Sequence, residues 1–228
     1  MKIAEVFYSI QGEGRLAGVP SVFVRTSGCN LRCHWCDTPY TSWQPEGEEM
    51  DVERIVAACR TFPARHLVLT GGEPMIAPRI AELTRRLKAC AYHITIETAA
   101  TVFATVECDL ASLSPKLSNS TPWQRDGGRF AQSHERLRMN VGVIQQWIDA
   151  HDHQLKFVVE GPADLPEIDE LLARLRRVRP ENVLLMPQGT SAAELASKAG
   201  PIAELCKQRG FRYCPRLHIE LYGNVRGT

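Results

Sequence analysis

The strongest constraint on this chain is a group of three cysteines within eight residues. Cys29, Cys33 and Cys36 are spaced C-x3-C-x2-C. A single buried cysteine fills a core position as a small hydrophobe, but three thiols this close together are typical of a metal-ligand set. Three thiolates give a [4Fe-4S] cluster three protein ligands and leave one iron with an open position. Because an open position can bind a reactant, the motif predicts a chemical site.

Other interpretations of the cysteine motif explain less of it. A c-type haem needs C-x-x-C-H, but an aspartate follows the last cysteine here. A thioredoxin-like pair would use only the last two cysteines and leave Cys29 without a role. A structural zinc site normally has four ligands, so the fourth would come from a distant residue such as Cys214 or His218. Zinc and the redox pair remain minor alternatives at this point. The other cysteines are scattered and are interpreted as small buried hydrophobes: Cys59, Cys90, Cys108, Cys206 and Cys214.

Length and composition indicate an ordinary soluble enzyme-sized domain. The chain has 228 residues and a formal net charge of +1, so we expect one domain and no broad attraction to nucleic acid or membrane. The N-terminus has no basic region followed by an apolar run, and no apolar stretch reaches about 20 residues. We therefore expect a cytoplasmic protein. In that reducing compartment, clustered cysteines favour metal binding over disulfides.

Strand and helix patterns alternate along the chain. The pattern predicts strands at 3–7, 21–26, 67–69, 94–96, 109–113, 155–159 and 182–186, and helices at 51–60, 78–90, 136–150, 164–178 and 191–209. This alternation predicts an α/β fold with a parallel sheet and right-handed crossovers. Six units are fewer than the eight of a closed barrel, so a partial (β/α)6 barrel fits better, with a doubly wound sheet as the alternative.

The domain organisation follows from the same pattern. Residues 1–228 form one domain, in which 1–20 are an N-terminal extension carrying a candidate ligand-binding loop. Residues 117–135 are polar and rich in Gly and Ser, which predicts a long loop or an ordered insertion. Residues 211–228 are predicted to be an extended C-terminal tail.

Polar groups follow several of the predicted strands. They stand in the cysteine loop, at Thr70–Pro74, at Glu97–Ala99, at Ser114–Lys116 and at Pro187–Gly189. In parallel α/β folds ligands bind at the carboxyl ends of the strands, so these segments are expected to meet at one rim. Within Gly71-Gly72-Glu73-Pro74 the glycines let a ligand approach the backbone. Free carbonyls and the carboxylate of Glu73 would suit a positively charged amino group.

The cysteine motif and the downstream Gly-Gly-Glu-Pro together resemble the radical S-adenosylmethionine enzymes, whose core is a partial (β/α)6 barrel. The resemblance covers most of the chain. More narrowly, the chain resembles the 7-carboxy-7-deazaguanine synthase family in the segments Tyr8–Gly14, Cys29–Thr38 and Ser114–Lys116, and at Arg25. Activating enzymes for glycyl radicals share the cysteine motif and remain an alternative, which predicts a large protein substrate.

This resemblance implies a reaction. A [4Fe-4S] cluster would pass an electron to S-adenosylmethionine and release a 5′-deoxyadenosyl radical, and the adenosyl cofactor would be regenerated. The radical would take a hydrogen from C6 of 6-carboxy-5,6,7,8-tetrahydropterin. Ring contraction and loss of ammonia would give 7-carboxy-7-deazaguanine, a step toward 7-deazapurines such as queuosine. The implied enzyme is a lyase and a homodimer that receives electrons from an external reductant such as flavodoxin or ferredoxin.

The resemblance also implies roles for individual residues. Cys29, Cys33 and Cys36 would hold the cluster, and the Thr38 hydroxyl, a hard ligand, would bind Mg2+. The residues implied for S-adenosylmethionine are Trp35, Cys36, Asp37, Gly72, Glu73, Glu97, Ser114, Pro115, Lys116 and Gln188. Those implied for the pterin are Ile10, Gln11, Gly12, Glu13, Arg25, Thr70 and the terminal carboxylate of Thr228. The guanidinium of Arg25 suits a carboxylate, although a structural ion pair would also explain an arginine on a strand.

Overall fold

The computed structural model describes all of residues 1–228 and contains one nine-stranded sheet of order β3-β1-β2-β4-β5-β6-β7-β8-β9. β1 pairs antiparallel with β2 and β3, and every pair from β2 to β9 is parallel. The sheet ends at β3 and β9 and does not close, which confirms the partial barrel. The strands are β1 (Lys2–Ile10), β2 (Pro20–Thr26), β3 (Glu48–Glu49), β4 (His66–Gly71), β5 (His93–Thr98), β6 (Leu110–Leu113), β7 (His153–Val159), β8 (Val183–Pro187) and β9 (Arg212–Tyr213).

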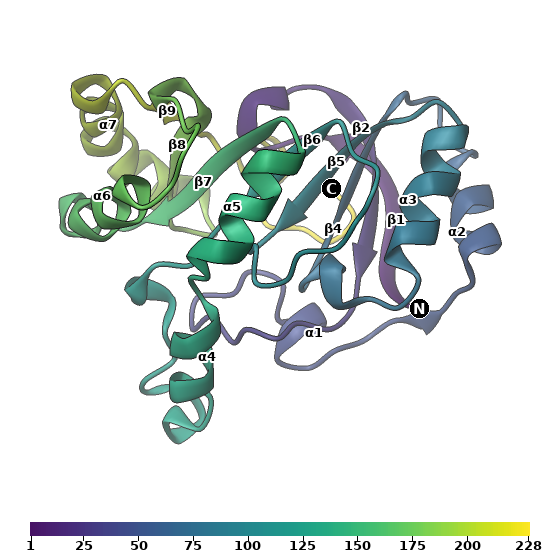
Figure 1. Ribbon diagram of the computed structural model, residues 1–228, viewed down its shortest axis with the longest axis horizontal. Helices are drawn as coiled ribbons and strands as arrows, with labels where there is room; N and C mark the ends of the chain where they lie inside the picture. Colours follow the sequence, from purple (N-terminus) through teal and green to yellow (C-terminus); the bar gives the residue numbers. More distant parts are fainter.

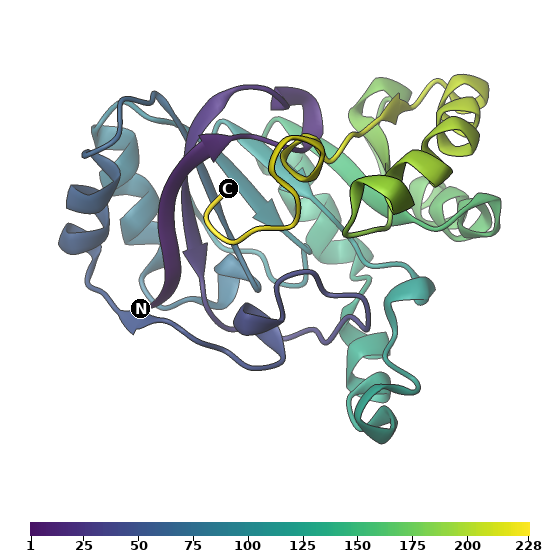
Figure 2. The same cartoon turned by 180° about the vertical axis from the view of Figure 1, so that it is seen from behind.

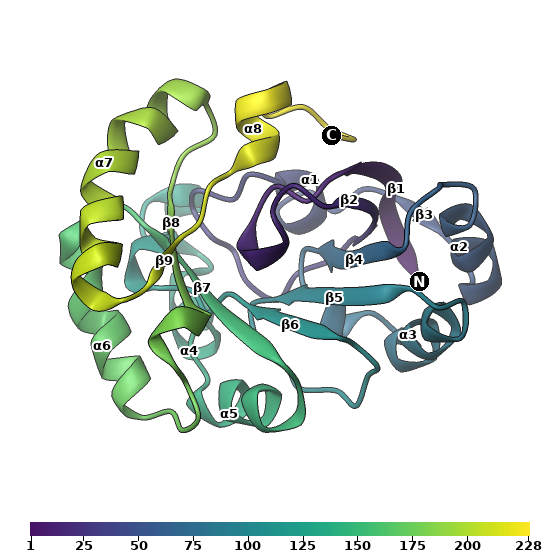
Figure 3. The same cartoon turned by 90° about the horizontal axis from the view of Figure 1, so that it is seen from above.

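Helices form an outer arc around this curved sheet (Figure 3). The arc consists of α2 (Val52–Cys59), α3 (Ile80–Ala89), α5 (Val141–Ala150), α6 (Leu165–Ala173) and α7 (Ala192–Arg209). Local signals fix their ends: the Asp51 side chain accepts the Arg54 N–H at 2.8 Å, and Ser191 and Glu194 form a capping box. Three shorter helices lie outside the arc, α1 (Pro39–Ser42), α4 (Ala131–Leu137) and α8 (Leu217–Tyr222). None of these helices has the length and hydropathy required to cross a membrane.

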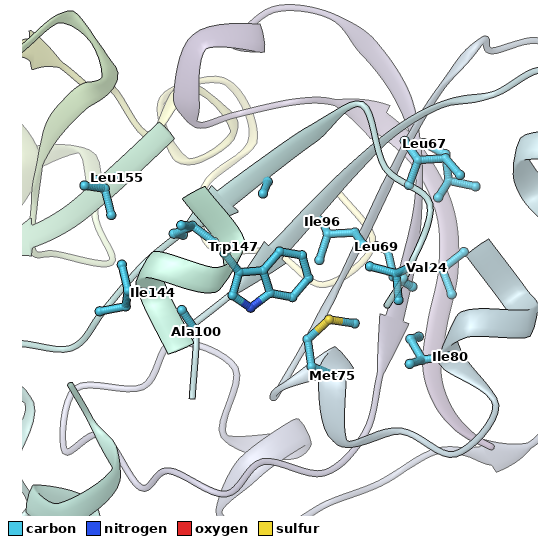
Figure 4. Close-up of a cluster of buried hydrophobic side chains, with 14 of the residues drawn as sticks. Val24, Leu67, Leu69, Met75, Ile80, Ile96, Ala100, Ile144, Trp147 and Leu155 are labelled. Atoms are coloured by element: carbon cyan, nitrogen blue, oxygen red, sulfur yellow. The ribbon is translucent and has the colours of Figure 1, made fainter. Parts of the chain in front are cut away.

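The hydrophobic core lies between the sheet and the arc of helices (Figure 4). Trp147 of α5 is fully buried there, with its indole N–H donating to the Val102 carbonyl at 3.1 Å and its ring edge-on to Phe103. Residues 99–109 connect β5 to β6 without a helix. The large indole of Trp147 thus packs against this helix-free connection, and its polar N–H has a partner there.

Three sequence-based expectations are wrong in detail. The expected helix 136–150 begins only at Val141, because the Asn140 side chain caps it by accepting the Val143 N–H at 3.2 Å. The expected extended tail instead forms β9 and then α8, whose Ile219 is buried against the body. Cys90 is exposed at the end of α3, whereas a buried position was expected.

The segment between β6 and α5 is an ordered insertion. Residues 118–120 and 125–128 form two 3-10 turns, and α4 follows. In Figures 1 and 2 this segment projects from the body on the side where the loop after β2 and α1 lie. We call residues 118–137 the arm.

Candidate functional site

One cavity of about 300 Å3 lies at the carboxyl ends of the parallel strands, within the size range of small-molecule sites. The C-terminal tail crosses the open side of the barrel in front of it (Figure 2). The cavity brings together most of the sequence-predicted site residues: Ile10, Gln11, Gly12, Glu13, Arg25, Cys29, Cys33, Trp35, Cys36, Asp37, Thr38, Thr70, Gly72, Glu97, Ser114, Lys116 and Thr228. It does not include Glu73, Pro115 or Gln188 in its lining.

The three motif cysteines line this cavity together. Cys29 Sγ accepts the Leu31 N–H at 3.3 Å, and Cys36 Sγ lies 3.2 Å from Ser42 Oγ. Burial raises the pKa of Cys29 and of Cys33 to about 12, so both stay protonated until a metal binds and displaces the protons. No group of three His, Cys, Asp or Glu side chains is arranged to hold a single metal ion. Three thiols on one cavity wall are the donor set that a [4Fe-4S] cluster with one open iron takes from a protein.

The cysteine loop is clamped to the end of β4 by its backbone. The Glu73 N–H donates to the Gly28 carbonyl at 2.9 Å, and the Gly28 N–H donates to the Thr41 carbonyl at 2.8 Å. The backbone of Gly72 lies directly against this clamp. A Cβ on Gly72 would stand 2.2 Å from Gly28 O and 2.7 Å from Thr41 O, both backbone atoms. Only glycine permits this approach, which fixes where the cysteine loop sits relative to β4.

Gly72→Ala is expected to displace the cysteine loop and to lower the iron retained after reconstitution by about tenfold, because backbone atoms cannot move aside as side-chain ends can. The measurement is iron and sulfide per chain with a thermal unfolding curve. Gly142→Ala is the control, since Gly142 is exposed in helix α5, a Cβ there meets only Asn140 Oδ1 at 3.5 Å, and the helix gains propensity. Full cluster content in Gly72→Ala would contradict the clamp.

The carboxylate of Glu73 is turned away from the cavity. It is fully buried and accepts hydrogen bonds from Thr98 Oγ1 at 2.7 Å, Ala99 N at 2.9 Å and Met75 N at 3.0 Å. Burial raises its pKa, and these three donors oppose that rise. Its role is to tie the end of β5 to the turn after β4. In this structure Gly72 is the part of the motif that lines the cavity, and the expectation that the Glu73 carboxylate meets an amino group stays a prediction.

Pro115 and Gln188 also lie outside the main cavity. Pro115 is buried beside Ser114, which together with Lys116 does face the cavity. Gln188 lines a smaller adjoining cavity, and its side-chain oxygen accepts from Lys198 at 2.9 Å. The sequence placed both at strand ends correctly, but strand position alone does not tell which way a side chain points.

Hydrogen-bond acceptors and a cation line the wall of the cavity nearest β1, β2 and β5. Glu97 accepts from Gln11 Nε2 at 3.1 Å and from Thr70 Oγ1 at 2.9 Å. Arg25 lies 3.2 Å from Glu5 through Nε, so the structural ion pair is present. Its Nε has no hydrogen-bond partner, and the side chain still reaches the cavity. The guanidinium therefore keeps donors available for an anion.

Glu13 is at the centre of a buried charge network that the sequence did not reveal. Its carboxylate pairs with Lys156 of β7 and with Arg216 at 3.1 Å, and Arg216 also pairs with Asp37. Burial alone would raise the pKa of Glu13, but the Lys156 and Arg216 cations hold it well below its usual range. The same pairing raises the pKa of Lys156 despite its burial. All of these groups stay charged at the cavity wall near pH 7.

Several residues of the cavity were missed by sequence reasoning. For Lys156 a signal existed: a lysine within an otherwise apolar strand is rarely buried without a partner. Arg216 gave no signal, because the tail was expected to be extended, and His218 was considered only as a distant zinc ligand. His218 packs beside Gly12, and burial lowers its pKa and so favours the neutral imidazole. Tyr40 and Ser42 of α1 also line the cavity and were missed.

Comparisons with known proteins agree with this geometry. Residues 23–115 match the model of the radical SAM superfamily. The chain is 46% identical to a 7-carboxy-7-deazaguanine synthase of Halobacterium salinarum, over 100% of this chain and 93% of that protein. It is also 46% identical to one from Rhodopirellula baltica, over 99% of this chain and 88% of that protein.

A solved structure supports the fold over nearly the whole chain. The crystal structure of QueE from Escherichia coli superposes with a TM-score of 0.67 at 26% identity, covering 93% of this chain and 92% of that one. SuiB of Streptococcus suis, bound to S-adenosylmethionine, has a TM-score of 0.54 at 12% identity and covers 81% of this chain and 47% of that one, which indicates a shared fold. With the cysteine motif, the partial barrel and full-length relatives in agreement, the chain belongs to the 7-carboxy-7-deazaguanine synthase family of radical S-adenosylmethionine enzymes.

Proposed function

We propose that this chain is a radical S-adenosylmethionine lyase that converts 6-carboxy-5,6,7,8-tetrahydropterin to 7-carboxy-7-deazaguanine with loss of ammonia. The observation that carries the proposal is the composition of the cavity at the carboxyl ends of the strands. Three thiols, an open glycine backbone and a set of anion and cation partners for a polar heterocycle line the same 300 Å3. Full-length relatives at 46% identity bear the name of this activity.

The cofactors occupy the side of the cavity nearest the cysteine loop in this proposal. A [4Fe-4S] cluster and S-adenosylmethionine supply one-electron cleavage chemistry when bound. Cys29, Cys33 and Cys36 hold the cluster. The backbone at Gly72 accepts the amino group of the adenosyl cofactor. Trp35, Asp37, Glu97, Ser114 and Lys116 are proposed to surround the rest of it.

The pterin occupies the side nearest the Gln11–Glu13 loop. Arg25 donates to its carboxylate, and Mg2+ at the Thr38 hydroxyl is proposed to share that carboxylate. Glu13, held ionised by its two cations, accepts from ring N–H groups. Ile10 and Gly12 contribute backbone, and Gln11 and Thr70 orient Glu97 on the opposite wall. The terminal carboxylate of Thr228 is proposed to lie over the pterin, and the tail keeps water out.

The proposal is tested by anaerobic reconstitution with iron and sulfide, followed by dithionite, S-adenosylmethionine, Mg2+ and 6-carboxytetrahydropterin. We expect a brown protein and the ultraviolet absorbance of a 7-deazapurine, with more product than S-adenosylmethionine supplied, because the adenosyl cofactor is regenerated. A protein that yields no 5′-deoxyadenosine would refute the radical chemistry. Cleavage of S-adenosylmethionine without formation of the 7-deazapurine would refute the proposed substrate. A glycyl-radical activase would then be the remaining interpretation.

Two narrower assignments belong to the same proposal. All eight cysteines are free, which fits a reducing compartment, and we propose the cytoplasm. An external one-electron reductant is required to bring the cluster to its reduced state before turnover begins. The homodimer stays a prediction.

A further inference from the structure

The arm, residues 118–137, is attached directly to the cysteine loop. The His34 N–H donates to the Ser120 carbonyl at 2.9 Å, and the Trp35 indole N–H donates to the Asn119 carbonyl at 3.0 Å. Buried His134 of α4 accepts the Arg32 N–H at 3.1 Å. The arm therefore covers the outer side of the loop that carries the three thiols, opposite the cavity.

Where the arm meets α1, arginines and aromatic rings form one contiguous surface. Arg125 lies 3.9 Å above the ring of Trp43, and Trp43 packs edge-on against Phe130 with centroids 5.7 Å apart. Arg32 and Arg129 lie over Phe130 at 5.3 and 5.2 Å. We call these five residues the arginine–aromatic patch.

None of the three patch arginines forms an ion pair with a carboxylate of the protein. The ion pairs at the end of the arm instead join Glu135 to Arg138, which also pairs with Glu167. The whole chain carries a formal net charge of only +1. The patch is thus a local concentration of cations on a nearly neutral protein, which is a feature of surfaces that attract an acidic partner.

The patch is also bonded to the residues that carry the thiols. The Trp43 indole N–H donates to the Cys33 carbonyl at 3.0 Å. Arg125 donates to the carbonyl of the next residue, His34, at 2.7 Å. A partner seated on the patch is separated from a cluster ligand by one aromatic side chain and one hydrogen bond.

We propose that the arginine–aromatic patch is the docking surface for an acidic electron-donor protein. The inference rests on the proposed function, in which the cluster must be reduced from outside. In the step at this surface the donor loses one electron and the cluster gains one, with no bond formed or broken. Planar guanidinium groups and aromatic faces give such an interface its contact area, and the charge steers the encounter.

A second copy of this chain fits the patch less well. A two-fold symmetric interface centred on the patch would bring its arginines against the same arginines of the other copy. Like charges opposed in this way disfavour the contact. Charge complementarity therefore favours an acidic protein over self-association.

The test uses the reconstituted enzyme with two reductants. Arg129 is exposed, lies over the Phe130 ring and forms no ion pair, so Arg129→Gln and Arg129→Glu change the charge of the patch in two steps. The matched control is Arg85→Glu on α3, an exposed arginine on the far side of the barrel. Product formation is measured with reduced flavodoxin of negative net charge and, separately, with saturating dithionite.

With limiting flavodoxin we expect the initial rate of product formation to fall about tenfold in Arg129→Glu and less in Arg129→Gln, because the cluster is reduced more slowly, and the wild-type rate to fall as salt is added. With dithionite all variants should match the wild type. Equal flavodoxin rates in Arg129→Glu and Arg85→Glu would overturn the docking surface, as would a change of oligomeric state in Arg129→Glu by light scattering. No product with dithionite in the wild type would instead mark failure of the proposed function.

Discussion

Cys33→Ala is expected to remove the iron–sulfur cluster and with it all cleavage of S-adenosylmethionine. Cys33 is one of the three thiols on the cavity wall. Two thiolates leave two irons of the cluster without a protein ligand, so the cluster is not retained. The alanine removes one buried sulfur from a site beside Leu31 and Ala99, and the fold itself should survive a change this small.

The measurement is iron and sulfide per chain with visible absorbance after anaerobic reconstitution, alongside 5′-deoxyadenosine release. Cys90→Ala is the matched control, because Cys90 is exposed at the end of α3 and lies outside the cavity. We expect it to keep full cluster content and activity. A Cys33→Ala protein that holds as much iron as the control would refute the ligand set. If the variant lacks iron, a far-ultraviolet circular dichroism spectrum equal to that of the wild type would exclude misfolding as the cause of the missing cluster.

Much of the fold and of the site could be predicted because their signals are local. Apolar runs such as Leu67–Leu69 mark buried strands, and chain alternation then dictates parallel pairing. Once strands are parallel, every polar residue just past a strand falls on one rim. This is why the cysteine loop, Thr70, Glu97 and Lys116 line one cavity, although they are far apart in the sequence.

The remainder depends on contacts that no short stretch of sequence encodes. The direction of the Glu73 side chain depends on hydrogen bonds from Thr98 at the end of β5 and from the Ala99 N–H just after it, 25 and 26 residues further along the chain. Helix α8 has only six residues, and tertiary contacts such as the Leu217 N–H to the Gly12 carbonyl at 2.9 Å hold it in place. The partners of Glu13 come from β7 and from the tail. These contacts form only when the barrel is folded.

Arg216→Ala is expected to destabilise the protein by about 3–5 kcal/mol, because removing one partner of a buried ion pair leaves uncompensated charge. The Arg216 side chain is 7% exposed and donates to Glu13 at 3.1 Å and to the Gly189 carbonyl at 2.6 Å. It also pairs with Asp37, so it joins the Gln11–Glu13 loop, the cysteine loop and the tail. Arg209→Ala is the matched control. Its pair with Asp169 is about 40% exposed on both sides, and its loss should cost less than about 1 kcal/mol.

The pH dependence of this difference tests the cause. In the folded wild type the pKa of Glu13 is lowered, so its pairing adds stability that is fully present above the ordinary carboxylate pKa of about 4 and is lost as pH falls below it. In Arg216→Ala the buried Glu13 carboxylate keeps its pair with Lys156 but loses the Arg216 cation, so its pKa rises relative to that in the wild type. The gap in unfolding free energy between wild type and variant should therefore be largest near pH 7 and narrow below about pH 5, as measured by urea titration. A gap that stays constant with pH, or that equals the Arg209→Ala gap, would mean that Arg216 contributes packing alone.

The Glu13 carboxylate lines the cavity and is held ionised by its pairs with Lys156 and Arg216. The Glu13–Arg216 pair that stabilises the tail therefore also keeps a charged hydrogen-bond acceptor in the site, which suits a substrate rich in N–H donors.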